Sequence, residues 1–128
     1  MSKHRNKNLS LHISRLVAER LATAMRDYAQ AAYPAGGSEC AQSAREALMT
    51  AAQNLLDSHD AQQNHAQLNR RQRALTKAAI KYHAEKIAGE ETGVASAREA
   101  CLLAAIGGEV LTDEAYKKAQ QRDRGLAG

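Results

Sequence analysis

Alanine is the most frequent residue in this chain and favours helices over strands. It fills 27 of the 128 positions, while Phe and Trp are absent and only four residues are Tyr. Alanine has the highest intrinsic helix propensity, and strands are enriched in the aromatic and β-branched residues that are scarce here. The composition therefore predicts an all-α fold, and the length fits a single domain that buries its own core.

Apolar residues recur with a helical period along most of the chain. In the segment 9–33, Leu9, Ile13 and Val17 follow one another in steps of four, as in an amphipathic helix, and Pro34 ends the pattern. Similar spacing recurs further on, so we expect a small bundle of four to five helices. The expected helices cover residues 9–33, 43 to about 57, 61–88, 97–106 and 112 onward.

Two helix starts carry the same local signal. Ser43 with Glu46, and Ser96 with Glu99, have the spacing of an N-cap residue and the third helical residue in a capping box. In this motif each side chain accepts a hydrogen bond from the other residue's backbone amide. We therefore expect the second helix to begin after Ser43 and the fourth after Ser96.

The last helix is expected to begin at Thr112. Asp113 and Glu114 occupy its first turn, where negative charge is stabilised by the helix dipole, and Leu111 can pack onto Tyr116 across the cap. The same acidic residues argue against a helix-turn-helix reader of DNA, because the first residues of the second helix usually make the base contacts.

Residues 20–52 resemble residues 73–105 at an offset of 53. Of the 33 pairs, 12 are identical, including the pentapeptide Ser-Ala-Arg-Glu-Ala at 43–47 and 96–100. We expect two duplicated helical hairpins, packed as a four-helix bundle with a C-terminal helix added. The alternative is that alanine-rich helices with common capping chemistry match by composition. Either arrangement gives one helical domain over 1–128, in which residues 1–8 form a basic tail that need not be ordered.

Basic residues gather at two places in a chain with a net charge of +4. One is the N-terminal tail, and the other is the segment 61–84, which contains no acidic residue. Four of its cations fall in a narrow stripe at about 100° per residue. Such a stripe can follow a phosphate backbone or an acidic protein, or it can be an ordinary solvated face. The candidate partner-binding or phosphate-binding residues are Lys3, Arg5, Lys7, Arg70, Arg73, Lys77 and Lys81.

Motifs for catalysis, cofactors and metals are missing from the sequence. Cys40 and Cys101 form no CxxC pair, the five histidines form no HExxH, and no GxSxG, Walker or GxGxxG motif is present. The longest apolar run, 100–106, is too short to span a bilayer, and no apolar segment follows the polar start. We expect a cytoplasmic protein without catalytic residues, cofactor, metal or membrane contact.

These observations leave two classes of function. The leading hypothesis is a non-enzymatic binding or regulatory protein, an adaptor or inhibitor that presents helix faces to a protein partner. The alternative is a nucleic-acid-binding protein that uses the basic stripe with little sequence preference. Because small residues allow helices to approach closely, a homodimer is a further expectation.

Overall fold

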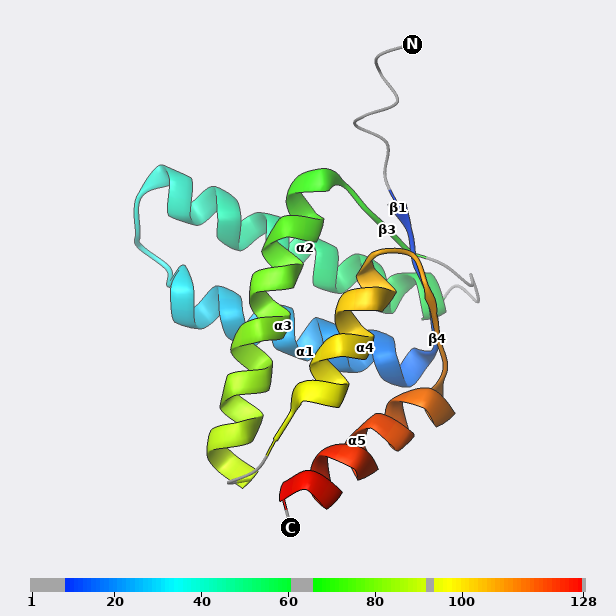
Figure 1. The fold of residues 1–128 in the computed structure, drawn as a ribbon. Helices are drawn as coiled ribbons and strands as arrows, with labels where there is room; N and C mark the ends of the chain where they lie inside the picture. The colour runs from blue at the N-terminus through cyan, green and yellow to red at the C-terminus, as the bar shows by residue number, and fades with distance from the viewer. Residues whose placement is uncertain (1–8, 61–65, 92–93, 128) are drawn as a thin grey trace.

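Short strands connect a bundle of helices in the computed structural model (Figure 1), which describes residues 9–60, 66–91 and 94–127. Within these ranges five α-helices account for most residues, and each of the four strands has two residues, so the all-α prediction is confirmed. In chain order the elements are β1 (Leu9–Ser10), β2 (His12–Ile13), α1 (Arg15–Ala32), α2 (Glu39–Asp60), β3 (Gln67–Leu68), α3 (Arg70–Glu91), α4 (Ser96–Ile106), β4 (Val110–Leu111) and α5 (Asp113–Ala127).

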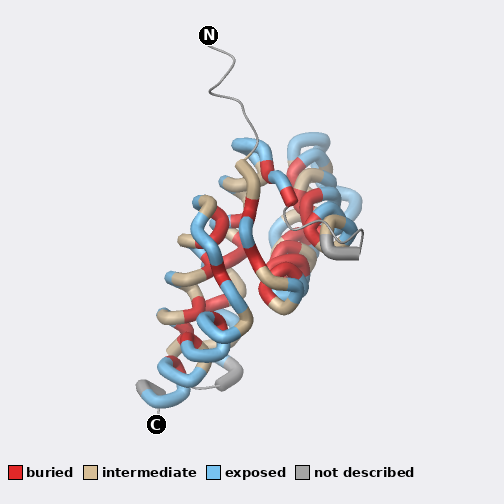
Figure 2. Tube along the Cα trace, turned by 90° about the vertical axis from the view of Figure 1, so that its right-hand side faces the viewer, coloured by how far each residue is buried: buried red, intermediate tan, exposed pale blue. Residues whose placement is uncertain are grey.

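Helix α1 lies at the centre of the bundle. It packs against α2, α3 and α5, and α4 bridges α3 and α5 on the side facing the viewer in Figure 1. Buried residues gather where the helices face one another, as Figure 2 shows, and the outer turns are exposed. The largest fully buried apolar side chains are Leu11, Val17, Leu21, Met25, Leu48, Leu55, Leu68, Ile80, Leu102, Ile106 and Tyr116.

The segment 9–13 pairs with two distant parts of the chain. Strand β1 runs antiparallel to β3, with Leu9 opposite Leu68, and β2 runs parallel to β4, with Ile13 opposite Leu111. The backbone amide of Leu11 also donates to the carbonyl of Ala66 at 2.8 Å. One N-terminal segment therefore fastens the connections that enter α3 and α5.

The prediction that the first helix begins at Leu9 is wrong. Leu9, Leu11 and Ile13 alternate with polar residues, which is the period of a strand, and Leu11 and Ile13 are buried while His12 is exposed. Helix α1 instead begins at Arg15, where the Ser14 hydroxyl accepts a hydrogen bond from the amide of Val17 at 3.3 Å. The expected end of this helix before Pro34 is confirmed.

The second and third helices do not start where the sequence predicts. Helix α2 begins at Glu39, because Ser38 rather than Ser43 accepts the hydrogen bond of a cap, from the amide of Ala41 at 3.2 Å. Ser43 therefore lies one turn inside the helix. The third helix was expected over residues 61–88. Residues 61–65 lie outside the described ranges, and residues 67–68 form β3 instead of helix.

Helix α3 starts with a capping box that the sequence analysis missed. The Asn69 Oδ1 atom accepts from the amide of Gln72 at 2.8 Å, and the Gln72 Oε1 atom accepts from the amide of Asn69 at 2.9 Å. Two backbone donors at the helix start are thereby satisfied. The helix then continues past Gly89, where a loop was expected, to Glu91.

The two C-terminal helices agree better with expectation. Helix α4 ends at Ile106, and its C-cap Gly107 is followed by Gly108, whose φ of 103° falls in the region that favours glycine. Helix α5 begins at Asp113 after Thr112, whose hydroxyl accepts a hydrogen bond from the amide of Ala115 at 3.1 Å. The predicted start of the last helix is confirmed.

The internal duplication stays a prediction. Ser43 lies inside α2, whereas Ser96 is the first residue of α4 and its N-cap position is Ala95, so the expected pair of serine caps is wrong. The buried positions of the two helices correspond at an offset of 54, one residue away from the sequence match. These pairs are Ala44 with Arg98, Leu48 with Leu102, Ala51 with Ala105, and Ala52 with Ile106.

Candidate functional site

Three cations of the predicted stripe form a row on the exposed face of α3. Arg70, Lys77 and Lys81 are exposed, fall within about 40° of one another around the helix, and extend over about 16 Å along it. We call these three residues the α3 basic row. Arg73 is half-buried, because its Nη1 atom donates to the carbonyl oxygen of Leu68 at 3.1 Å.

The N-terminal candidates cannot be compared with the row. Lys3, Arg5 and Lys7 lie outside the described residues. The structure thus brings Arg70, Lys77 and Lys81 together and turns Arg73 toward β3, but it gives no position for the tail.

Positive charge is concentrated at the start of α3. Arg70 and Arg71 are its first two residues, and the first turn contains no acidic residue. The helix dipole places partial positive charge at the same end, so these arginines stand where cations are least favourable. Arg71 is anchored by a 2.9 Å hydrogen bond from Nη1 to the Ser43 hydroxyl on α2. An acidic partner at this end of α3 would relieve the repulsion.

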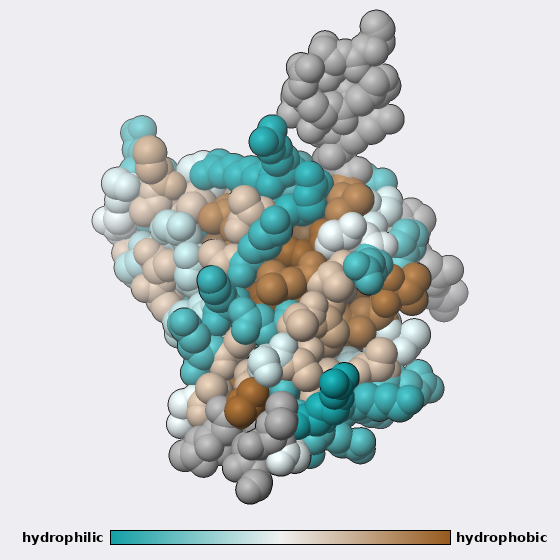
Figure 3. Space-filling model, viewed as in Figure 1, coloured by the Kyte–Doolittle hydropathy of each residue, from teal (hydrophilic) through white to brown (hydrophobic). Residues whose placement is uncertain are grey.

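Apolar surface adjoins the hydrophilic side chains of α3 on the same face of the molecule. Figure 3 shows hydrophilic atoms along α3 and apolar atoms beside them, over the nearby ends of α4 and the strands. Helix α4 and strand β4 each expose a large apolar side chain: Leu103 in α4 is 36% exposed, and Val110 in β4 is 72% exposed. Hydrophilic surface of α3 and apolar surface therefore lie side by side on this face of the molecule (Figure 3).

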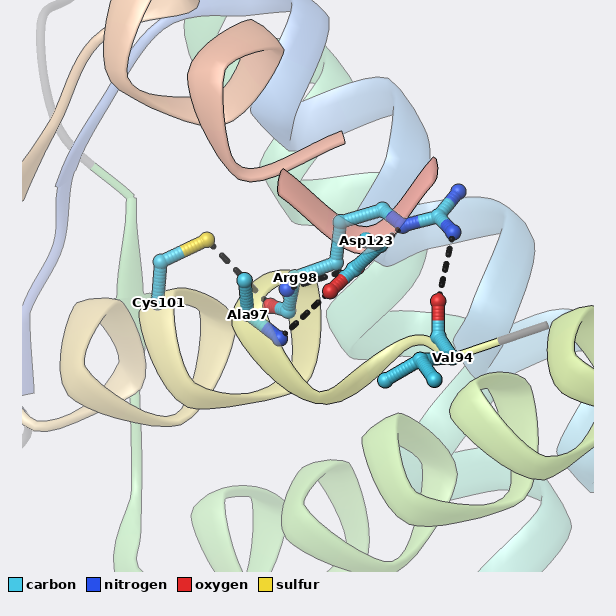
Figure 4. Close-up of polar contacts among 5 residues, drawn as sticks. All are labelled: Val94, Ala97, Arg98, Cys101 and Asp123. Carbon is cyan, nitrogen blue, oxygen red and sulfur yellow. Dashed lines mark hydrogen bonds and ion pairs between the residues drawn. The ribbon is translucent and has the colours of Figure 1, made fainter. Parts of the chain in front are cut away.

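A buried ion pair between α4 and α5 is the strongest polar contact that the sequence analysis missed. The Asp123 carboxylate is fully buried and accepts from Nε of Arg98 at 2.8 Å, and the Arg98 side chain is only 4% exposed (Figure 4). The same carboxylate accepts from the backbone amides of Ala97 at 2.8 Å and Arg98 at 3.2 Å. Arg98 also donates through Nη2 to the carbonyl of Val94 at 3.3 Å.

Asp123 performs the role that the sequence assigned to a serine cap. Ala95, the N-cap residue of α4, makes no side-chain hydrogen bond to the helix. The amides of the second and third helical residues, Ala97 and Arg98, are satisfied by Asp123 from α5 instead. Burial alone would raise the pKa of Asp123, but the hydrogen bonds from Arg98 and the two amides together hold this pKa below its ordinary value.

Side chains of the types that bind metals do not form a metal site in the described part of the chain. In residues 9–60, 66–91 and 94–127, no three His, Cys, Asp or Glu side chains lie close enough together to hold a metal ion. Cys40 is exposed, whereas the half-buried thiol of Cys101 donates to the carbonyl of Arg98 at 3.2 Å. Burial raises the pKa of the Cys101 thiol.

The fold and these sites define the class as a small all-α bundle in which short strand pairs fasten the helices. Comparison of the chain with protein-family models, with curated proteins and with solved structures gave no match. None of the helices in the described ranges is both long and apolar enough to cross a membrane.

Proposed function

We propose that this chain is a non-enzymatic binding protein, an adaptor or inhibitor, that presents the exposed face of α3 to a protein with an acidic surface. The observations that carry the proposal are the exposed α3 basic row and the apolar surface that adjoins the hydrophilic atoms of α3 (Figure 3). Protein interfaces combine an apolar centre with a polar rim. The row supplies charge for orientation, and apolar area beside it supplies burial.

Nucleic acid is the second candidate, and the start of α3 favours it. Arg70 and Arg71 add two cations to the positive end of the helix dipole, which is an arrangement suited to phosphate. Against it stands the lack of an exposed stacking platform among the described tyrosines. Tyr116 is buried, and Tyr28 packs against both Tyr33 and Tyr82 with ring centroids 5.8 and 5.7 Å apart.

Affinity purification with matched charge variants tests the leading proposal. The test variant combines Arg70→Gln, Lys77→Gln and Lys81→Gln, which removes the α3 basic row while keeping helix propensity nearly unchanged. The control removes the same charge from exposed positions of α5, through Lys117→Gln, Lys118→Gln and Arg122→Gln. Nuclease-treated lysate of the host should give the same protein partner with the wild type and the control, and none with the test variant.

Two outcomes would contradict this proposal. Retention of the partner by the test variant would show that the α3 basic row is only a solvated face. Loss of all co-purifying protein on nuclease treatment would favour nucleic acid, and duplex binding should then weaken steeply with salt. Each phosphate contact contributes about −0.9 to the slope of log affinity against log salt concentration. Removing the three cations of the row should therefore make the slope less negative, by about 0.9 for each contact that is lost.

A further inference from the structure

A small cavity lies at the junction of four helices, away from the exposed face of α3. It has a volume of about 260 Å³ and is formed by α1, α3, α4 and α5. This volume is below the range of sites for drug-sized ligands, so the occupant must be small. Six of its lining side chains are polar or charged: Arg20, Thr23, His83, Arg98, Tyr116 and Gln120.

Three of these polar groups have no hydrogen-bond or ion-pair partner among the described residues. Tyr116 is only 1% exposed, yet its hydroxyl makes no hydrogen bond to any described residue, and Arg20 makes no hydrogen bond or ion pair to one. The Nδ1 atom of His83 is buried and also lacks a partner. Arg20 and Thr23 are exposed, so the cavity opens to solvent, and the Tyr116 hydroxyl and the Arg20 guanidinium are available to a small ligand that enters it.

The charges around the cavity leave one cation unbalanced. Arg98 is neutralised by Asp123, and Lys86 lies 3.3 Å from Asp27, whereas no carboxylate pairs with Arg20 in the described residues. A guanidinium matches the geometry of carboxylate and phosphate oxygens. The cavity is therefore suited to an anion and unsuited to a cation.

The two titratable rings are set to donate hydrogen bonds at neutral pH. Burial raises the pKa of Tyr116, which keeps its hydroxyl protonated. Burial also lowers the pKa of His83, and although Asp27 opposes this shift, Lys86, Arg98 and Arg20 reinforce it. The neutral ring with a buried, unpartnered Nδ1 places its proton on Nε2, since an orphaned donor is rarer than an orphaned acceptor.

We propose that this cavity binds a small oxyanion, with Arg20 supplying the charge and Tyr116, Gln120 and Thr23 supplying hydrogen bonds. The ligand is a phosphate group or a short carboxylic acid, which share the oxygens that these donors recognise. Because an anion stabilises an imidazolium, its binding should raise the pKa of His83 and should strengthen as the pH falls through that pKa.

Isothermal titration calorimetry of the whole chain with inorganic phosphate and with succinate tests the site, at ionic strength held constant with sodium chloride. At least one of the two should bind saturably at millimolar concentration, and phosphate against succinate distinguishes the two sources of oxygen. Nitrogen NMR of the His83 ring should report a raised pKa in the presence of the bound anion. Failure of both anions to bind saturably would overturn the proposal.

Matched variants locate the binding in this cavity. Arg20→Gln should weaken the affinity about tenfold or more, since it removes the one lining cation that has no carboxylate partner among the described residues. The control Arg15→Gln removes the same charge from an exposed position of α1 outside the cavity and should leave the affinity unchanged. Tyr116→Phe keeps the buried ring, so it should fold and bind several-fold more weakly. Equal affinities in wild type, Arg20→Gln and Tyr116→Phe would refute the site, whatever the result for the α3 basic row.

Discussion

Replacing Asp123 with asparagine tests the buried ion pair directly. The substitution keeps the side-chain shape, but it removes the charge that faces Arg98 and places an amide donor near the backbone amides of Ala97 and Arg98. Breaking a buried pair on one side costs about 3–5 kcal/mol, because the other charge stays in a medium of low polarity. This is a large share of the about 5–15 kcal/mol by which a domain is stable.

Thermal and urea unfolding, followed by circular dichroism, measure this loss. For a chain of this length the melting temperature of Asp123→Asn should fall by about 10–20 °C. The control Glu46→Gln removes a carboxylate from an exposed position of α2 and should change stability by less than about 0.5 kcal/mol. Adding Arg98→Met to Asp123→Asn should restore part of the stability, because no unpaired charge is then buried. Equal unfolding curves for Asp123→Asn and Glu46→Gln would refute the reasoning.

The pH dependence gives a second measure of the same contact. Because the pKa of Asp123 is lower in the folded state than its ordinary value of 3.8, its contribution to stability is complete above that ordinary value. The contribution declines as the pH falls below 3.8 and is lost below the folded pKa. The stability difference between wild type and Asp123→Asn should therefore be constant from neutral pH to about pH 5 and shrink in stronger acid. A difference that persists unchanged in strong acid would contradict an ionic origin.

Three further predictions concern the core, two glycines and the oligomeric state. Leu21→Ala should destabilise by about 2–5 kcal/mol in urea unfolding, whereas Leu75→Ala should cost less, because Leu21 is fully buried and Leu75 is half-buried; equal losses would show that the core is misplaced. Gly108→Ala should destabilise by about 1–2 kcal/mol because of its positive φ, whereas Gly89→Ala inside α3 should stabilise by about 0.5–1 kcal/mol; the opposite order would contradict the assigned backbone conformations. Light scattering after size exclusion should give twice the 13.8 kDa of one chain if the expected homodimer forms, and a single 13.8 kDa species would exclude it.

The helices themselves could be predicted from the sequence, because their apolar period and alanine content are local properties. The start of α5 at Asp113 follows from Thr112 and the acidic residues after it, and the structure confirms it. The starts of α1 and α2 could not be fixed in the same way. Ser43 offers the same capping chemistry as Ser38, and Ser14 caps α1 only because the residues before it form β2 with the distant strand β4.

The polar sites depend on contacts between distant residues, which explains why the sequence did not reveal them. Arg98 and Asp123 are 25 residues apart and meet only because α4 packs against α5. Ser96 and Glu99 have the correct spacing for a local cap, yet a carboxylate from another helix takes that position. The period of two in Leu9, Leu11 and Ile13 was the one available signal for the strands, and the helical steps of four through Val17 masked it.

The strand pairs of the N-terminal segment also set the order in which the chain can fold. Leu9 pairs with Leu68, and Ile13 pairs with Leu111, so residues made early in synthesis find their last partner only when most of the chain has been made. Contacts of such high sequence separation slow folding and cannot be replaced by local ones. On the ribosome, α1 and α2 can form while the chain grows, but the β2–β4 pair can form only after β4 has left the exit tunnel. Pausing of synthesis before residue 110 would leave residues 9–13 without half of their strand partners.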